Sequence, residues 1–135
     1  VQRHGGFIMV HTWESDATCT VEKCEIMLKQ YPDVSLILTH SFGSPDGIFK
    51  TIRLVNEYDN AYMDTTGFKY TDVNIEEIVN HVNVKKVFYG SDMPFLEMRN
   101  GLSRILYADI DDRIKKRILS ENFRKLLISN TKHLA

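Results

Sequence analysis

The sequence contains little cysteine and proline and carries no large excess of either charge. Its 135 residues include two cysteines and three prolines, and the formal net charge is −1. Cys19 and Cys24 fit neither a disulfide framework nor a short metal-binding knuckle, so we expect ordinary thiols in a reducing cytoplasm. The nearly balanced charge argues against a nucleic acid or a membrane surface as the main partner.

Long apolar runs and leader patterns are also absent from the sequence. No apolar run approaches the roughly 20 residues of a membrane helix, and the start shows no signal-peptide pattern. We therefore expect a cytoplasmic protein that acts on a small molecule, with homo-oligomer formation left open. Because the chain begins with Val1, and residues 1–6 look like a helix end leading into a strand, we expect a preceding part of the protein.

Four apolar segments alternate with helical patterns along the chain. Strands are expected at residues 7–11, 34–40, 60–67 and 87–89. Helices are expected at residues 20–31, 47–58 and 74–82, the first capped by Thr20 and the second by Asp46. After Pro94 the pattern predicts shorter helices, of which Asp111 and Asp112 open one and Ser120 opens the last.

This alternation predicts the α/β class with a parallel sheet. Two architectures fit, an open doubly wound sheet or part of a (β/α)8 TIM barrel. A complete barrel needs about 200 residues or more, so four βα units correspond to half of one.

Three polar residues, His11, His40 and Asp92, each follow the end of a predicted strand. The carboxyl ends of parallel strands share one edge of the sheet, where α/β proteins carry their sites. Two imidazoles and a carboxylate at that edge suit a divalent metal such as zinc. The alternative is that each residue only caps a strand or turn, or packs locally.

Other side chains near the strand ends have open roles. Trp13 and Glu14 could line the pocket or pack within their loop, and residues 41–43 are better placed to meet a ligand. Asp64 ends the weak third strand and could join the site, although a structural turn role is favoured.

Two arginines could bind a substrate carboxylate through paired hydrogen bonds. Arg53 lies within a predicted helix, where a solvated position is favoured, and Arg99 follows the Asp92 loop. A Ser/His/Asp hydrolase is excluded because no Gly-x-Ser-x-Gly motif is present.

Four motifs together resemble a known family. They are Leu-Ile-Leu-Thr-His at 36–40, Ala-Tyr-Met-Asp-Thr-Thr-Gly at 61–67, Phe-Tyr-Gly-Ser-Asp-Met-Pro-Phe at 88–95 and Ile-Leu-Ser-Glu-Asn-Phe-Arg-Lys-Leu-Leu at 118–127. In this order, and covering almost the whole chain, they resemble the C-terminal half of an amidohydrolase-related metal-dependent hydrolase. That branch of the amidohydrolase superfamily also contains aminocarboxymuconate semialdehyde decarboxylase.

The resemblance implies a (β/α)8 TIM barrel in which residues 1–135 form a single domain fragment with strands 5 to 8. It implies that His11 binds the metal from the fifth strand and that His40, on the sixth, acts in catalysis or substrate binding. Asp92, on the eighth strand, would be both metal ligand and proton acceptor. The implied cofactor is a divalent metal, Zn or alternatively Mn.

One family feature is missing. The first-strand His-x-His pair occurs nowhere in this sequence, which leaves His11 and Asp92 as ligands, fewer than the three of a typical catalytic zinc. We expect the N-terminal half of the barrel to be absent and this chain alone to bind metal poorly. The expected function is a hydrolase in which a metal-activated water attacks a C–O or C–N bond. The alternatives are a nonoxidative decarboxylase on the same scaffold and a noncatalytic truncated α/β module.

Overall fold

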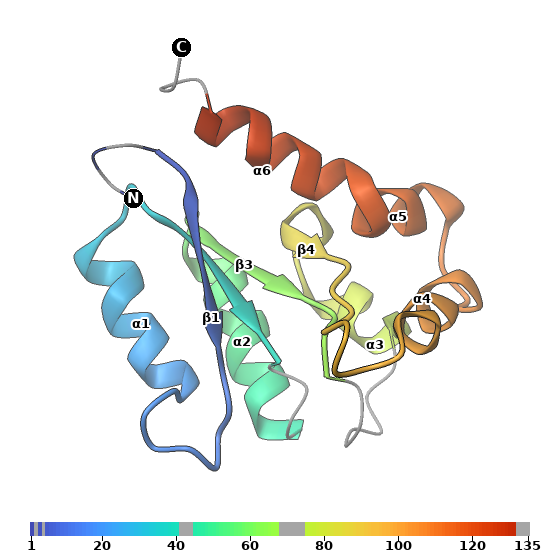
Figure 1. The fold of residues 1–135 in the computed structure, drawn as a ribbon, viewed down its shortest axis with the longest axis horizontal. Coiled ribbons are helices and arrows are strands. Elements are labelled where there is room, and N and C mark those ends of the chain that lie inside the picture. The colour runs from blue at the N-terminus through green and yellow to red at the C-terminus, as the bar shows by residue number, and fades with distance from the viewer. Residues whose placement is uncertain (2, 4, 41–44, 68–74, 132–135) are drawn as a thin grey trace.

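Strands and helices alternate along the chain, as the sequence predicts. The structure, a computed structural model, describes residues 1, 3, 5–40, 45–67 and 75–131 (Figure 1). The elements are, in order, β1 (Phe7–His11), α1 (Val21–Gln30), β2 (Ser35–Thr39), α2 (Pro45–Glu57), β3 (Ala61–Asp64), α3 (Ile75–His81), the 3-10 turn η3 (Val84–Lys86), β4 (Val87–Phe88), α4 (Met98–Leu106), α5 (Asp112–Lys116), the π-helical turn η4 (Arg117–Glu121) and α6 (Asn122–Thr131).

The strands form one parallel sheet of four strands in the order β1-β2-β3-β4. β1 pairs with β2 from Phe7 opposite Ser35 to His11 opposite Thr39. Each strand lies beside the next one in the sequence, so α1, α2 and α3 lie in the connections between neighbouring strands. The expected α/β class with a parallel sheet is confirmed.

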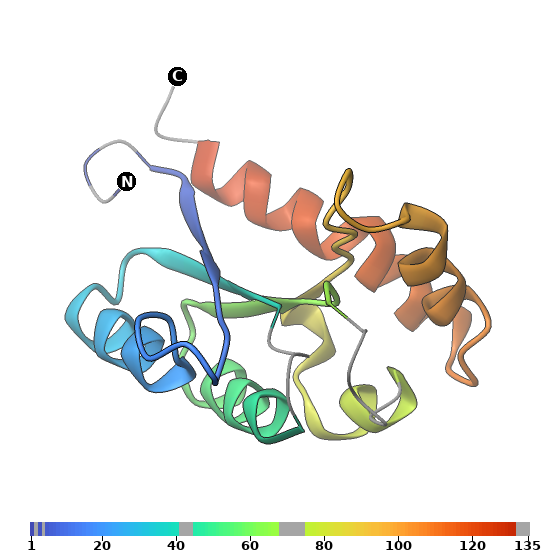
Figure 2. The ribbon, with the colours of Figure 1, turned by 60° about the horizontal axis from the view of Figure 1, so that its bottom comes forward.

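One face of the sheet packs against α1, α2 and α3, which lie below it in Figure 2. The strand side chains on this face are apolar and mostly buried, and Ile48, Ile52 and Val55 of α2 are buried against them. The main members of this core are Leu36, Leu38, Met63, Val87, Val21, Cys24, Leu28, Ile48, Ile52, Val55, Ile75 and Ile78. Burial on this face holds the three crossover helices in place.

The second face of the sheet packs against α6, which lies above it in Figure 2. The Phe123 ring packs edge-on against Phe7 of β1, with ring centroids 5.5 Å apart, and against Phe88 of β4, at 5.4 Å. Ile37 of β2 and Leu126 of α6 are buried in the same cluster. Since side chains alternate between faces along a strand, His11 lies on this second face together with Phe7.

Two apolar residues that the sequence pattern places on buried surfaces are exposed. Met9 in β1 is 56% exposed, because it points to the same face as Phe7 but lies outside the apolar cluster that packs there. Ile26 in α1 is 63% exposed, because the buried stripe of that helix runs through Val21, Cys24 and Leu28. The apolar run predicted β1, yet none of its five residues is fully buried. The helical periodicity predicted α1, but it placed Ile26 on the buried side.

Two helix starts also differ from those expected. The Thr20 side chain makes no capping bond, and the Val21 N–H donates instead to Glu14 Oε1 at 3.0 Å. α2 begins at Pro45, so Asp46 lies within its first turn. Residue 74, where the third helix was expected to begin, lies outside the described residues, as do residues 2 and 4 of the expected helix end.

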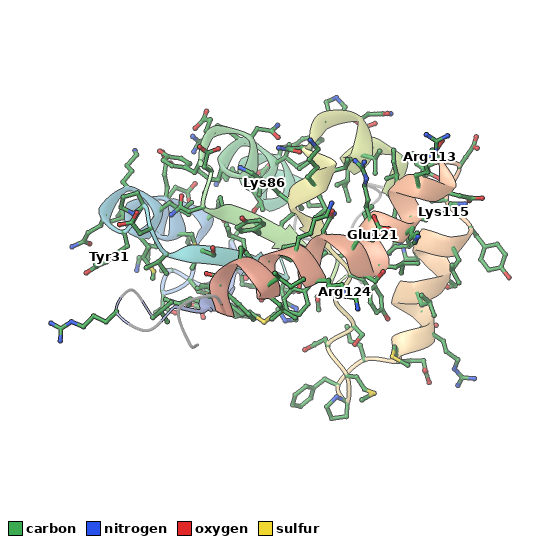
Figure 3. All side chains as sticks on the ribbon, turned by 90° about the horizontal axis from the view of Figure 1, so that it is seen from above. Tyr31, Lys86, Arg113, Lys115, Glu121 and Arg124 are labelled. Carbon is green, nitrogen blue, oxygen red and sulfur yellow. The ribbon has the colours of Figure 1, made fainter. Side chains whose placement is uncertain are left out.

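The end of α2 is held by Lys86, whose position is labelled in Figure 3. Its ammonium donates to the Val55 carbonyl at 3.1 Å and to the Tyr58 carbonyl at 2.8 Å. A cation at the C-terminal end of a helix satisfies carbonyls that have no partner within the helix. η3 is thereby tied to the helix that precedes β3.

The last helices are continuous, whereas Ser120 was expected to open a new one. η4 joins α5 directly to α6, and the Ser120 hydroxyl donates back to the Lys116 carbonyl at 3.3 Å. Buried Asn122 instead connects this helix to the sheet, because its amide donates to the carbonyls of Val84 (2.6 Å) and Val87 (2.9 Å). None of the helices in the described part of the chain is long and apolar enough to span a membrane.

Candidate active site

Three side chains predicted from the sequence lie at the carboxyl edge of the sheet. His11 is the last residue of β1, His40 follows β2 directly, and Asp92 lies in the loop after β4. The His11 and His40 rings are 4.7 Å apart between centroids, and His40 Nε2 lies 3.7 Å from Asp92 Oδ1. His40 thus has both of the other predicted residues as neighbours.

The backbone at two of these residues is in an unusual conformation. His40 has φ 61° and Asp92 has φ 57°, and these are the non-glycine residues with positive φ in the described part of the chain. The left-handed region costs a side-chain-bearing residue roughly 1 kcal/mol or more. Such conformations persist where the surrounding structure fixes them, and they often occur at functional sites.

Burial favours the neutral form of His40. Burial lowers the pKa of the imidazole, and the nearby His11 lowers it further, while Asp92 raises it. Burial is the largest of these effects, so the neutral ring predominates at pH 7. A neutral imidazole can both donate and accept a hydrogen bond.

Asp64 lies at the same edge and is almost fully buried, with 3% of the residue exposed. Its carboxylate accepts hydrogen bonds from the Thr66 N–H at 3.1 Å and the Thr66 hydroxyl at 2.8 Å. Burial raises its pKa to about 6, opposed by hydrogen bonds from Thr66 and from the His40 backbone. Asp64 therefore supports the turn after β3, as favoured, and also holds the backbone of His40.

Of the other candidate residues, one adjoins the site and one has a structural role. Trp13 stacks on the exposed His11 ring at 5.9 Å between centroids and so adjoins the site. Glu14 forms an ion pair with Lys50 at 2.5 Å and accepts the first N–H of α1, which are structural roles. Residues 41–43 lie outside the described residues.

The two arginines weighed as carboxylate binders are engaged elsewhere. Arg53 pairs with Glu25 at 2.7 Å and with Glu57 at 2.8 Å on the helical layer. Arg99 is largely exposed and pairs with Glu97 at 3.1 Å. The structure brings neither to His11, His40 and Asp92.

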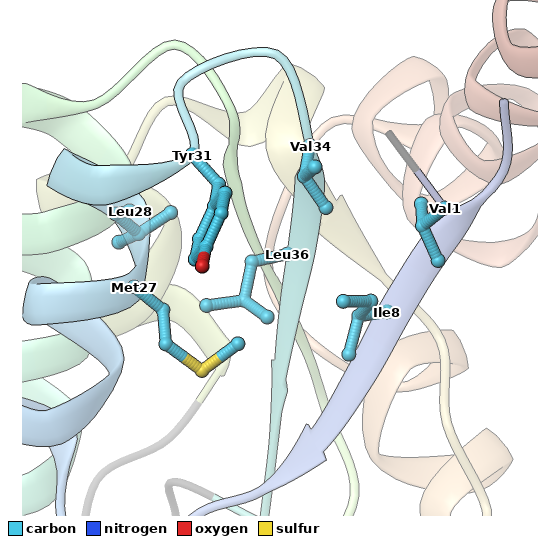
Figure 4. A pocket seen from close by; sticks show the side chains of 7 residues that line it. All are labelled: Val1, Ile8, Met27, Leu28, Tyr31, Val34 and Leu36. Atoms are coloured by element: carbon cyan, nitrogen blue, oxygen red, sulfur yellow. The ribbon is translucent and has the colours of Figure 1, made fainter. Parts of the chain in front are cut away.

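A separate apolar pocket of about 200 Å³ lies between β1 and α1 (Figure 4). Its lining includes Ile8, Met27, Tyr31 and Leu36. These residues come from the early part of each strand and from the last part of α1, away from the carboxyl edge. The pocket therefore has no part in the site chemistry.

The site contains donors that suit a divalent metal, but only part of a ligand set. Imidazole nitrogen and carboxylate oxygen are the ligand types that zinc and manganese take. Across residues 1, 3, 5–40, 45–67 and 75–131, no three His, Cys, Asp or Glu side chains are arranged to hold a metal ion. A metal held by His11 and Asp92 would need further ligands.

Comparison with known proteins identifies a matching family. A family model described as Amidohydrolase matches residues 1–127 of the chain. The comparison with curated proteins finds no match to this chain.

Solved structures share the fold at low sequence identity. An uncharacterized TIM-barrel protein from Bordetella bronchiseptica is 16% identical with a TM-score of 0.71, over 97% of this chain and 48% of that one. A putative 2-pyrone-4,6-dicarboxylic acid hydrolase from Pseudomonas putida is 13% identical with a TM-score of 0.63, over 93% of this chain and 52% of that one. A dihydroxybenzoic acid decarboxylase from Polaromonas sp. JS666 has bound manganese and the inhibitor 2-nitroresorcinol. It is 18% identical with a TM-score of 0.57, over 77% of this chain and 36% of that one. The chain thus spans about a third to a half of these structures.

Proposed function

The chain belongs to the amidohydrolase family, and from this premise we propose that it forms strands 5 to 8 of a (β/α)8 barrel and carries part of a metal-dependent active site. The parallel order of the four strands supports this assignment. The sheet face that carries Phe7 and His11 would then line the barrel interior, and the carboxyl edge would be its catalytic end.

The observation that carries the proposal is the position of His40 beside both His11 and Asp92. His11 and Asp92 would hold a divalent metal, with Zn²⁺ and Mn²⁺ as the candidates. When bound, such a metal polarises a substrate and lowers the pKa of water. The manganese in the Polaromonas structure is the reason to test that metal beside zinc.

The side chains of this chain would then handle the proton and the substrate. Asp92 accepts a proton, because its carboxylate faces His40 and remains partly accessible, with 30% of the side chain exposed. Neutral His40 binds the substrate or orients the attacking water by hydrogen bonding. The reaction is hydrolysis of a C–O or C–N bond in a small molecule.

The second candidate function is nonoxidative decarboxylation. It is favoured by the structural likeness to the dihydroxybenzoic acid decarboxylase, whereas the likeness to the putative 2-pyrone-4,6-dicarboxylic acid hydrolase favours hydrolysis. Both names describe a carboxylate-bearing substrate. We therefore propose small anionic compounds of this kind as the substrates to test.

The experiment compares Asp92→Asn with the native sequence, each within the complete barrel that this proposal implies and each supplied with Zn²⁺ or Mn²⁺, on a cyclic dicarboxylate ester and on dihydroxybenzoates. We expect the variant to lose turnover by about a hundredfold or more, because the proton acceptor is removed, while its circular dichroism spectrum is unchanged. Asp33→Asn, at an exposed position, is the matched control.

Full turnover in Asp92→Asn would remove Asp92 from this role. A complete barrel containing this chain that binds neither metal and acts on neither substrate class would favour the noncatalytic module instead.

A further inference from the structure

A layer of buried polar side chains lies beneath the candidate active site. Most of the buried polar residues in the described part of the chain end or follow a strand at the carboxyl edge of the sheet. They are Thr12, Thr39, Asp64, Thr65 and Thr66. Since buried polar groups are held by hydrogen bonds, the bonds of this layer fix the strand ends relative to one another.

The peptide unit between Thr39 and His40 is held from both sides. Its carbonyl oxygen accepts the Thr12 N–H at 2.9 Å and the Thr12 hydroxyl at 2.5 Å, both from the loop after β1. Its N–H, which belongs to His40, donates to the Asp64 carboxylate at the end of β3. Because both polar atoms of this peptide unit are bonded, the neighbouring strands hold His40 in its left-handed conformation, with φ 61°.

The Asp64 carboxylate is in turn oriented by Thr66. Oδ1 accepts the Thr66 N–H at 3.1 Å, and Oδ2 accepts the Thr66 hydroxyl at 2.8 Å. These two groups and the His40 N–H are all donors, and an ionised carboxylate is a side chain that only accepts. Thr66 therefore fixes the orientation of Asp64 and, through it, the backbone of His40.

The same layer holds the turn that leads to Asp92. The Gly90 N–H donates to the Thr65 hydroxyl at 3.3 Å. A Cβ at Gly90 would be 2.5 Å from Asp64 Oδ2, so the backbone of Gly90 lies directly against the carboxylate. The position of Asp64 thus affects the start of the turn, two residues before Asp92.

The loop after β3 also contacts the ring of His40. Gly67 has φ 92°, and a Cβ at this position would be 3.3 Å from His40 Nδ1. This loop therefore limits the ring of His40, while the carboxylate that precedes it holds the His40 backbone.

We propose that Asp64 and Thr66 are positioning residues of the candidate active site. Thr66 orients the Asp64 carboxylate, which holds the backbone of His40 and the turn that precedes Asp92. His40 is thereby kept next to both His11 and Asp92. Both positioning side chains are buried, so they act through His40 rather than on a substrate. The inference deepens the proposed function and rests on it, since the residues that are positioned are those of the proposed site.

The test compares Thr66→Val with the native chain by NMR, with labelled histidine. The His11 and His40 rings, 4.7 Å apart between centroids, should give a nuclear Overhauser effect in the native protein. Thr66→Val keeps the shape of the side chain but removes the hydroxyl that orients Asp64. We expect this effect to weaken by about twofold or more and the His40 ring signals to shift, because a hydrogen bond to a charged group is lost. Thr66→Ser retains the hydroxyl and should give the native spectrum.

Thr51→Val is the matched control. Thr51 of α2 is as buried as Thr66, but its hydroxyl has no hydrogen-bond partner in the described part of the chain. The same substitution there should leave both histidine rings unchanged. Asp64→Asn is the second variant, because it replaces one acceptor oxygen with a donor among donors. It should change the same signals, and it provides the reading if Thr66→Val does not fold.

Kinetics within the complete barrel give an independent reading. Thr66→Val should lower kcat by about tenfold or more and change KM less, because a small displacement of a reacting group slows the chemical step. Thr66→Ser should restore kcat. An equal loss in Thr51→Val would indicate a general loss of stability and count against positioning.

The outcomes for positioning and for function are distinct. Unchanged His40 signals in both Thr66→Val and Asp64→Asn would overturn the proposal. Displacement of His40 in these variants, together with no turnover in the native barrel, would support the positioning role and count against the enzyme.

Discussion

Gly90 lies at a point where two buried side chains leave no space for a larger residue. A Cβ at this position would be 2.5 Å from Asp64 Oδ2 and would overlap the Thr66 hydroxyl oxygen. Both neighbours are buried and are hydrogen-bonded to each other, so neither can move away without a cost in free energy. The Gly-Ser-Asp sequence thus begins with a residue required by packing.

We expect Gly90→Ala to destabilise the protein by about 1–3 kcal/mol, the usual cost of adding volume to a packed site. The measurement is the free energy of unfolding in urea. Gly101→Ala is the control, because Gly101 lies within α4 and its Cβ would make only an ordinary contact with Tyr89 at 3.4 Å. That change should stabilise by about 0.5–1 kcal/mol through helix propensity. Equal effects at the two glycines would contradict the packing argument.

At the scale of residues, the sequence placed His11, His40 and Asp92 at one edge, because parallel strands bring their carboxyl ends together. Their assigned roles remain predictions. The contact of Asp64 with the His40 backbone was not foreseen, although Asp64 ends β3 as His11 ends β1.

At the scale of elements, α1 and α2 are joined by charged groups around Glu25. Its carboxylate pairs with Arg53 of α2 at 2.7 Å and with Lys29 at 2.9 Å, and it accepts the Tyr58 hydroxyl at 2.9 Å. Arg53 is the largest cause, followed by Lys29 and Tyr58, of a pKa lowered to about 2. The ionised form is therefore favoured in the folded protein.

This lowered pKa has a defined effect on stability. The pKa of Glu25 in the folded protein, about 2, lies below the ordinary glutamate value of 4.5. The stabilisation is therefore complete above pH 4.5 and is lost as the pH falls towards 2. We expect Glu25→Gln to be less stable than the native protein at pH 7 and to lose that difference between pH 4.5 and 2. Urea unfolding at a series of pH values measures this difference in the free energy of unfolding.

Arg53→Gln removes the side chain that contributes most to the lowered pKa of Glu25. In this background, Glu25→Gln should therefore cause a smaller pH-dependent loss of stability than in the native protein. A constant difference between native protein and Glu25→Gln across this range would show that the carboxylate is not held in its ionised form by these partners.

The sequence predicted most elements but not where each begins and ends. Helical periodicity found α1, α2 and α3, because their apolar stripes pack on one sheet face. It could not show that η4 continues into α6, since Ser120 reads locally as a helix start. The buried bonds from Asn122 to Val84 and Val87 come from tertiary packing, which local sequence does not encode.

At the scale of the whole molecule, the sheet has two open edges among its described strands, at β1 and β4. On the half-barrel proposal, α6 covers a face that further strands would otherwise cover. Met9 on β1 is 56% exposed, and an open strand with an apolar side chain favours pairing with another chain.

We therefore expect this chain to self-associate as its concentration rises, with the mass measured by size-exclusion chromatography and light scattering. Met9→Lys should shift the association to higher concentration, because a charge on an edge strand opposes pairing. Ile26→Lys places the same charge on an equally exposed apolar residue of α1 and should have little effect. A compact monomer at all concentrations would count against the half-barrel proposal.

The α/β class and the parallel sheet could be predicted from the alternation of strands and helices alone. The position of α6 could not, because its apolar residues fit either face of the sheet equally well. The cluster in which Phe123 meets Phe7 and Phe88 shows which face it covers.

The contact between Phe7 and Phe123 also has a consequence for synthesis of the protein. A ribosome makes β1 before α6, so α6 cannot cover the face of the sheet that carries Phe7 and Ile37 until that helix has emerged. Exposed apolar surface on a partly made sheet is prone to aggregation. We therefore expect a chain shortened before α6 to aggregate more readily than the chain that includes it.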